Sequence, residues 1–145
     1  DRILRELRIG LGSLGHRSGR GLEEAVRATV EEFSGVGPLQ AERLVLKDAA
    51  GEVFGIPGQA IEFDAFVHDG RRFLVEVKGF AEPEDVLKFF RKLQFAQRQL
   101  DEPFERLMIA PFAQKRAVQL AQELGIRMLL AEAEQEEQPE ASGPV

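Results

Sequence analysis

The sequence predicts a mixed α/β fold in which a sheet is sandwiched between helices. Residues 61–67 and 73–77 are apolar-rich runs on either side of a turn sequence centred on Asp69-Gly70, a pattern typical of a β-hairpin. Beyond residue 83, helical and strand patterns alternate, and such strand–helix–strand units favour crossover connections with helices on the sheet faces. A chain of 145 residues suits one domain with a substantial core. We therefore expect a central mixed sheet between two helical layers.

The first part of the chain predicts two helices. Residues 1–18 place leucine and isoleucine at helical spacing before glycines interrupt the pattern, so they form either a helical arm of the same domain or the end of an upstream coiled coil that dimerises. Residues 22–34 predict a helix with one apolar stripe. Glu23 lies beside that stripe, either as an ordinary surface residue or within reach of a metal site at the edge of the stripe, whereas Glu24 points toward solvent.

Two short strands are expected before the hairpin, at residues 42–46 and 52–54. A turn sequence at residues 48–51 separates them. Residues 55–58 contain two glycines and a proline, which bend the chain into the hairpin.

After the hairpin, Pro83 is suited to the first position of a helix that runs to Leu100. Three bases lie off its apolar stripe: Lys88, Arg91 and Lys92. They form either an ordinary solvated face or a surface that binds a phosphate backbone. Residues 104–111 predict an interior strand, residues 113–124 a helix and residues 126–130 a last strand.

Composition limits the possible functions only loosely. The absence of cysteine excludes disulfides and thiolate–zinc sites. Because no signal peptide or membrane-length apolar run is visible, we expect a cytoplasmic protein with no membrane partner. The net charge of −6 argues against nucleic acid, but five acidic residues lie in the last fourteen positions. The remaining chain is close to neutral, and residues 132–145 are expected to be a disordered acidic tail.

Three ionisable residues interrupt the apolar pattern of the hairpin: Asp64, Glu76 and Lys78. Charges on core strands are costly unless they are paired or bind a metal. A carboxylate on each of two adjacent strands can hold Mg²⁺, which prefers oxygen ligands. This interpretation makes Asp64, Glu76 and the backbone carbonyl of Val77 metal ligands, and Lys78 the catalytic cation that stabilises charge on a phosphate.

The turn decides whether these residues meet. A two-residue turn pairs Asp64 with Val75 and puts the two acids on opposite faces, whereas a three-residue turn or a bulge pairs Asp64 with Glu76. The metal site requires the second arrangement. The alternative is a Glu–Lys pair on a solvent-facing strand, with Asp64 at a frayed edge.

The motif of Asp64, eleven intervening residues and then Glu76-Val77-Lys78 resembles the PD-(D/E)XK nuclease superfamily. The resemblance implies a three-layer α/β/α restriction-endonuclease-like core, a site that binds Mg²⁺ or Mn²⁺, and cleavage of DNA, less often of RNA. Members often carry a glutamate on the first helix, a role that falls on Glu23, with Glu24 in reserve. The chain looks most like a prokaryotic branch in which a predicted coiled coil precedes the nuclease-like domain.

The resulting hypothesis divides the chain into a helical arm at residues 1–18, a nuclease-like domain at 19–131 and the acidic tail at 132–145. It makes the protein a metal-dependent nuclease that acts on DNA and forms a homodimer through the helical arm. The alternative is a catalytically inactive module with the nuclease fold, which serves DNA binding or dimeric assembly.

Overall fold

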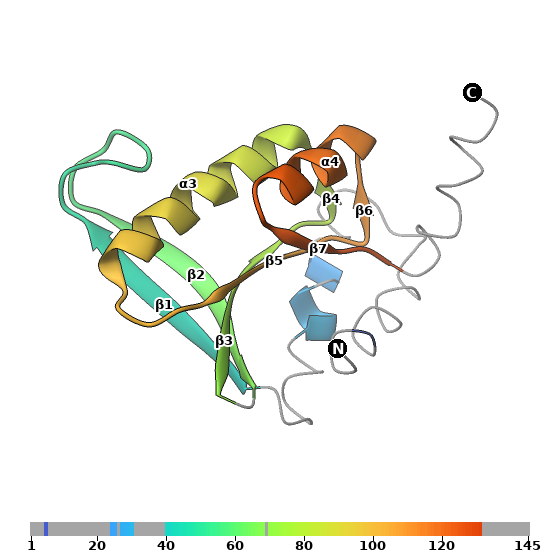
Figure 1. The fold of residues 1–145 in the computed structure, drawn as a ribbon, viewed down its shortest axis with the longest axis horizontal. Coiled ribbons are helices and arrows are strands. Elements are labelled where there is room, and N and C mark those ends of the chain that lie inside the picture. The colour runs from blue at the N-terminus through green and yellow to red at the C-terminus, as the bar shows by residue number, and fades with distance from the viewer. Residues whose placement is uncertain (1–4, 6–23, 26, 31–39, 69, 132–145) are drawn as a thin grey trace.

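The computed structural model describes residues 5, 24–25, 27–30, 40–68 and 70–131. Its main feature is a five-stranded sheet with the order β1-β2-β3-β5-β7 (Figure 1). β2 pairs antiparallel with both β1 and β3, whereas β5 pairs parallel with both β3 and β7. The strands are β1 (Gln40–Asp48), β2 (Gln59–His68), β3 (Arg71–Val77), β5 (Glu105–Ile109) and β7 (Arg127–Leu129). The predicted mixed sheet is confirmed.

Helices lie on both faces of this sheet. α3 (Pro83–Gln99) and α4 (Lys115–Glu123) pack side by side on one face, over the larger hydrophobic core. The helical residues 24, 25 and 27–30 lie on the other face, where Val30 joins a second, smaller core. The three-layer arrangement predicted from the sequence is therefore confirmed.

The long helix α3 begins and ends close to where its sequence predicts. Pro83 is its first residue, and the Asp85 carboxylate accepts a hydrogen bond from the Glu82 N–H at 2.9 Å. Such a contact satisfies an N–H group that has no partner inside the helix.

The helix α4 begins two residues later than predicted because residues 112–113 belong to a strand. This strand, β6 (Phe112–Ala113), pairs in parallel with β4 (Phe80–Ala81). The two-residue pairs are too short to leave a periodic pattern in the sequence. They hold the starts of α3 and α4 together, since Gln114 also donates its N–H to the Ala81 carbonyl.

The strand predicted at residues 52–54 is wrong, because Asp48 organises that segment as a turn. Its buried carboxylate accepts hydrogen bonds from the N–H groups of Glu52 and Val53, at 2.9 and 2.8 Å. Gly51 has a φ of 72°, and a Cβ there would lie 2.9 Å from the Pro57 nitrogen. The loop between β1 and β2 is thus built around one carboxylate.

Asp48 makes the stability of this loop dependent on pH. Burial raises the pKa of Asp48, but N–H donors from Val53, Glu52 and Gly51, together with the charge of Arg98, outweigh it and leave the pKa below its ordinary value. In the unfolded chain, an aspartate carboxyl has a pKa of about 4. A carboxyl whose pKa is lower in the folded state stabilises the fold fully above that pH, and this contribution is lost as the pH falls through the pKa of the folded state.

We expect Asp48→Asn to lower the free energy of unfolding at pH 7, and the difference from the parent to shrink at pH 3. Urea denaturation at the two pH values measures this difference. Asp101→Asn, at an exposed position, is the control. A difference that is equally large at both pH values would contradict the prediction.

Candidate active site at the fork of the sheet

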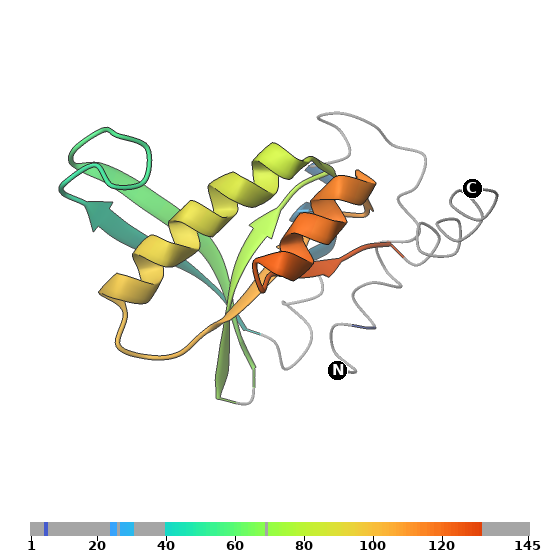
Figure 2. The same ribbon diagram turned by 45° about the horizontal axis from the view of Figure 1, so that its top comes forward.

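The candidate site lies where β2 and β3 separate. These strands pair only from Asp64–Val75 to His68–Arg71. Before Asp64, β2 continues alongside β1 alone, and after Val75, β3 continues alongside β5. The two strands therefore open into a V, which we call the fork, and α3 spans it (Figures 1 and 2). Asp64 and Glu76 both lie at the point of separation.

The expected pairing of Asp64 with Glu76 is wrong. His68 pairs with Arg71, so only residues 69 and 70 connect the strands, and neither β2 nor β3 contains a bulge in the pairs they form. Gly70 has the positive φ, 77°, that a two-residue hairpin turn demands. Because residues opposite each other in an antiparallel pair share a face, Asp64 lies on the face of Val75. Glu76 and Lys78 point to the other face, toward α3.

On its own face, Asp64 contacts a base from the helical residues 27–30. The Arg27 Nη1 atom donates a hydrogen bond to the Asp64 Oδ2 atom at 3.1 Å, and the Asp64 side chain is 34% exposed. Asp64 is therefore a partly buried, ion-paired residue and not a residue at a frayed edge.

Glu76 and Lys78 lie under α3 and are each paired with a charge from that helix. The Lys92 Nζ atom lies 3.2 Å from the Glu76 Oε1 atom, with side-chain exposures of 16% and 22%. The Lys78 Nζ atom lies 3.7 Å from the Asp85 Oδ1 atom, with exposures of 31% and 20%. Lys92, Glu76, Lys78 and Asp85 thus alternate in sign, and we call them the four-charge row. The alternative of a solvent-facing Glu–Lys pair is wrong, because these side chains are mostly covered.

Of the three bases on α3 that are predicted to bind nucleic acid, two are exposed and one points to the sheet. Lys88 is exposed and ion-paired with Glu84 one turn earlier, at 3.7 Å. Arg91 is exposed. Lys92, predicted to lie off the buried face, instead points to the sheet, where its ammonium also lies 5.0 Å from the centre of the Phe63 ring. Lys92 therefore contacts residues from both arms of the fork.

The structure describes only some of the other predicted residues. Glu23, the helical arm at residues 1–18 apart from Arg5, and the tail at 132–145 lie outside the described residues. Glu24 is exposed, as expected. The Val77 side chain is buried in the smaller core, so of this residue only the backbone is left to serve a site.

The described residues do not fit the predicted metal site as they are placed. Asp64 and Glu76 face opposite sides of the sheet, and each already has a base as its partner. Within the part of the chain that the structure describes, no group of three or more His, Cys, Asp or Glu side chains could hold a metal ion. The single ion shared by Asp64, Glu76 and the Val77 carbonyl is therefore not supported by this arrangement.

Sequence reasoning overlooked Asp85. Its position on α3 contained a signal, because Asp85 lies four residues before Phe89 and seven before Lys92, and such spacing puts the three side chains on one face. An acid and a base on the buried stripe of a helix indicate partners on the sheet beneath it.

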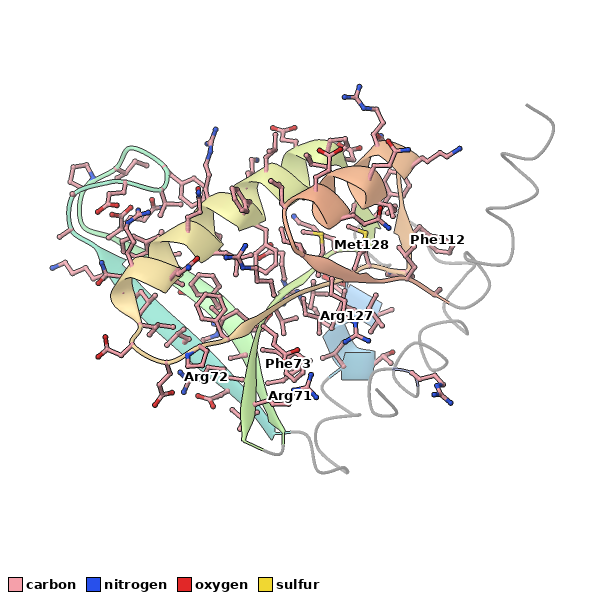
Figure 3. All side chains as sticks on the ribbon, viewed as in Figure 1. Arg71, Arg72, Phe73, Phe112, Arg127 and Met128 are labelled. Atoms are coloured by element: carbon pink, nitrogen blue, oxygen red, sulfur yellow. The ribbon has the colours of Figure 1, made fainter. Side chains whose placement is uncertain are left out.

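The hairpin end of β3 offers a second group of bases, labelled in Figure 3 as Arg71 and Arg72. Arg71 donates two hydrogen bonds to Glu105, at 2.6 and 2.8 Å. The hydrogen bond and charge of Arg71, with a contribution from Arg127, outweigh burial and lower the pKa of Glu105. These bases lie at the opposite end of β3 from Glu76 and are balanced by acids, so they do not extend the site.

No described helix is long and apolar enough to cross a membrane.

Comparison with known families gives two adjacent matches. Residues 1–57 match a family of proteins of unknown function, DUF3782, and residues 59–127 match the PD-(D/E)XK nuclease superfamily. No curated protein and no solved structure matched the chain.

The two matched regions share one sheet, because β1 from the first pairs along its whole length with β2 from the second. The second region contains the fork, the four-charge row and both helices of the larger core. Its mixed sheet with flanking helices agrees with a restriction-endonuclease-like fold. Over residues 59–127, the chain is therefore similar to the PD-(D/E)XK nuclease superfamily.

Proposed function

We propose that this protein is a nuclease that hydrolyses phosphodiester bonds in DNA and requires Mg²⁺ or Mn²⁺, with RNA as the second choice of substrate. The observation that carries the proposal is the position of Glu76 and Lys78. They lie within the region that matches a nuclease superfamily, on one face, at the fork.

Glu76 and Lys78 supply part of the chemistry that phosphodiester hydrolysis needs, a carboxylate and an ammonium on one face of the sheet. The Lys78 ammonium offers positive charge to a phosphate whose negative charge increases in the transition state. A divalent ion, where a nuclease uses one, lowers the pKa of a bound water and neutralises charge on the phosphate. Lys88 and Arg91 present bases on the exposed flank of α3 that can hold the DNA backbone. Glu23 and Asp64 complete the proposed set of acids. Asp64 takes part only if the strands rearrange at the fork, so that its side chain reaches the face of Glu76.

Removal of divalent metal is expected to abolish cleavage. Supercoiled plasmid incubated with the protein and Mg²⁺ or Mn²⁺ should become nicked or linear, excess EDTA should stop the reaction, and renewed Mg²⁺ should restore it. Gel analysis over time measures each step. Cleavage that persists in EDTA would contradict metal dependence, and the absence of cleavage on any DNA or RNA would contradict the proposed activity.

A second candidate function is a catalytically inactive module that binds DNA or assembles as a dimer. The register of β2 and β3 favours it, because the two acids of the motif lie on opposite faces. For such a module, we expect salt-sensitive DNA binding without metal-dependent cleavage.

Dimerisation through residues 1–18 is part of both candidate functions. Removal of these residues should then convert a dimer to a monomer, which light scattering measures.

A further inference from the structure

We infer that α3 positions the two charged residues of the Glu76-Val77-Lys78 motif, Glu76 through Lys92 and Lys78 through Asp85. The catalytic consequence of this inference rests on the proposed nuclease function, whereas the positioning itself does not. Lys92 and Asp85 act through Glu76 and Lys78, and are therefore positioning residues.

The helix presents these two charges on its buried side. Asp85, Phe89, Lys92 and Ala96 follow one another at intervals of four, three and four residues, so they form one stripe along α3. Phe89 and Ala96 are buried in the larger core. The stripe therefore faces the sheet. Because Phe89 and Ala96 are packed in the core, the charged side chains of the same stripe are also held against the sheet.

Asp85 is itself fixed before it meets Lys78. Its Oδ2 atom accepts the Glu82 N–H at 2.9 Å, at the first turn of α3. This leaves its Oδ1 atom for the Lys78 ammonium at 3.7 Å. A lysine ends a flexible chain of four carbons, so an anchored carboxylate restricts where its ammonium can lie.

Lys92 is fixed from both arms of the fork. Its ammonium lies over the Phe63 ring from β2 and beside the Glu76 carboxylate from β3. Because the Lys92 side chain is 16% exposed, it has little room to reach water instead. Burial of a charge requires a partner, and a base in this position therefore holds the Glu76 carboxylate turned toward the fork.

The order of charges indicates that the two ion pairs act together as one arrangement and are not two unrelated contacts. Alternation along β3 puts Glu76 and Lys78 on the same face, and α3 offers a base to the acid and an acid to the base. The row is neutral as a whole, which allows it to lie under a helix.

Three variants and a control test this inference. Asp85→Asn removes the charge but keeps an oxygen that can accept the Glu82 N–H, so the helix start is retained. Lys92→Met removes the ammonium and keeps the length of the side chain, and Lys92→Arg restores the charge. Glu84→Gln is the matched control, because it removes a carboxylate from the adjacent residue, whose partner is the exposed Lys88.

Two measurements are made on each variant. Nitrogen NMR of the lysine ammonium groups reports how restricted the Lys78 and Lys92 Nζ atoms are, independently of activity. Steady-state cleavage reports kcat and KM. We expect Asp85→Asn to make the Lys78 Nζ atom more mobile, and both Asp85→Asn and Lys92→Met to lower kcat about tenfold or more with KM within about twofold, because misplacing a reacting group by 1 Å can cost that much. Lys92→Arg should recover part of the loss, and Glu84→Gln should match the parent in kcat and in the Lys78 Nζ signal.

An unchanged Lys78 Nζ signal in Asp85→Asn would overturn the inference, even if the protein cleaves DNA. Equal losses of kcat in Glu84→Gln would also overturn it, because a general effect of charge would then explain the result. If the parent protein cleaves nothing while the Nζ atoms respond as expected, the proposed function fails and the positioning by α3 stands.

Discussion

Replacing Lys78 with methionine is expected to slow DNA cleavage about 100-fold or more while leaving the fold intact. Removal of one preorganised group that stabilises transition-state charge typically costs a factor of about 10² to 10³ in kcat. The Lys78 side chain is 31% exposed, more than the 22% of Glu76 on the same face, so its ammonium is the group on this face best placed to contact a phosphate. Methionine preserves the stem of the side chain, and the comparison therefore isolates the charge.

Single-turnover cleavage of a labelled DNA duplex, with Mg²⁺ present, measures this effect. Lys47→Met is the control, because Lys47 is an exposed base on β1, away from the α3 side of the fork. A Lys78→Met protein that cleaves as fast as the parent would sink the proposed role of the motif. In the same assay, an equal loss in Asp64→Asn would mean that the strands rearrange at the fork when substrate or metal binds.

Much of the fold could be predicted because its signals are local. The stripe of α3 and its initial proline define one long helix, and the apolar runs on either side of residues 69–70 define the hairpin. Alternation of strands and helices after residue 83 gives the parallel half of the sheet. Each of these features depends on residues that are close together in the sequence.

The face of Asp64 could not be predicted, because β2 has apolar residues on both sides. Phe63 and Ala65 enter the larger core, whereas Phe66 enters the smaller one, so neither register exposes an apolar face to water. Hydrophobic pattern fixes register only where one face is clearly polar. The turn then decides, and a turn of two residues and a turn of three both suit a sequence that contains Asp-Gly.

The site under α3 was hidden for a different reason. Charges on a helix are ordinarily assigned to solvent, and this rule placed Lys92 outside the core. It fails where two charged elements pack against each other, because each then neutralises the other. Recognising the four-charge row requires knowing that α3 crosses the fork, which is a property of the tertiary structure.

Phe63→Ala is expected to lower the free energy of unfolding by about 3–5 kcal/mol, the usual cost of removing a buried aromatic ring. Phe63 is among the largest fully buried side chains and lies in the larger core. Loss of its ring also removes the surface on which the Lys92 ammonium rests, a contact worth about 0.5–2 kcal/mol. The change therefore affects the core and the candidate site together.

Urea denaturation of the parent and variant measures the loss, with Phe54→Ala as the matched control. Phe54 is 42% exposed in the loop between β1 and β2, so the same substitution there should change stability by about 0.5 kcal/mol or less. A loss below about 1 kcal/mol for Phe63→Ala would mean that the ring is not packed as described, since even partial collapse around a buried ring leaves a larger cost. Phe63→Leu distinguishes the two contributions: it keeps apolar volume and removes the aromatic face, so a Lys92 ammonium that becomes mobile in a variant of nearly full stability would show that the ring holds the lysine at the fork.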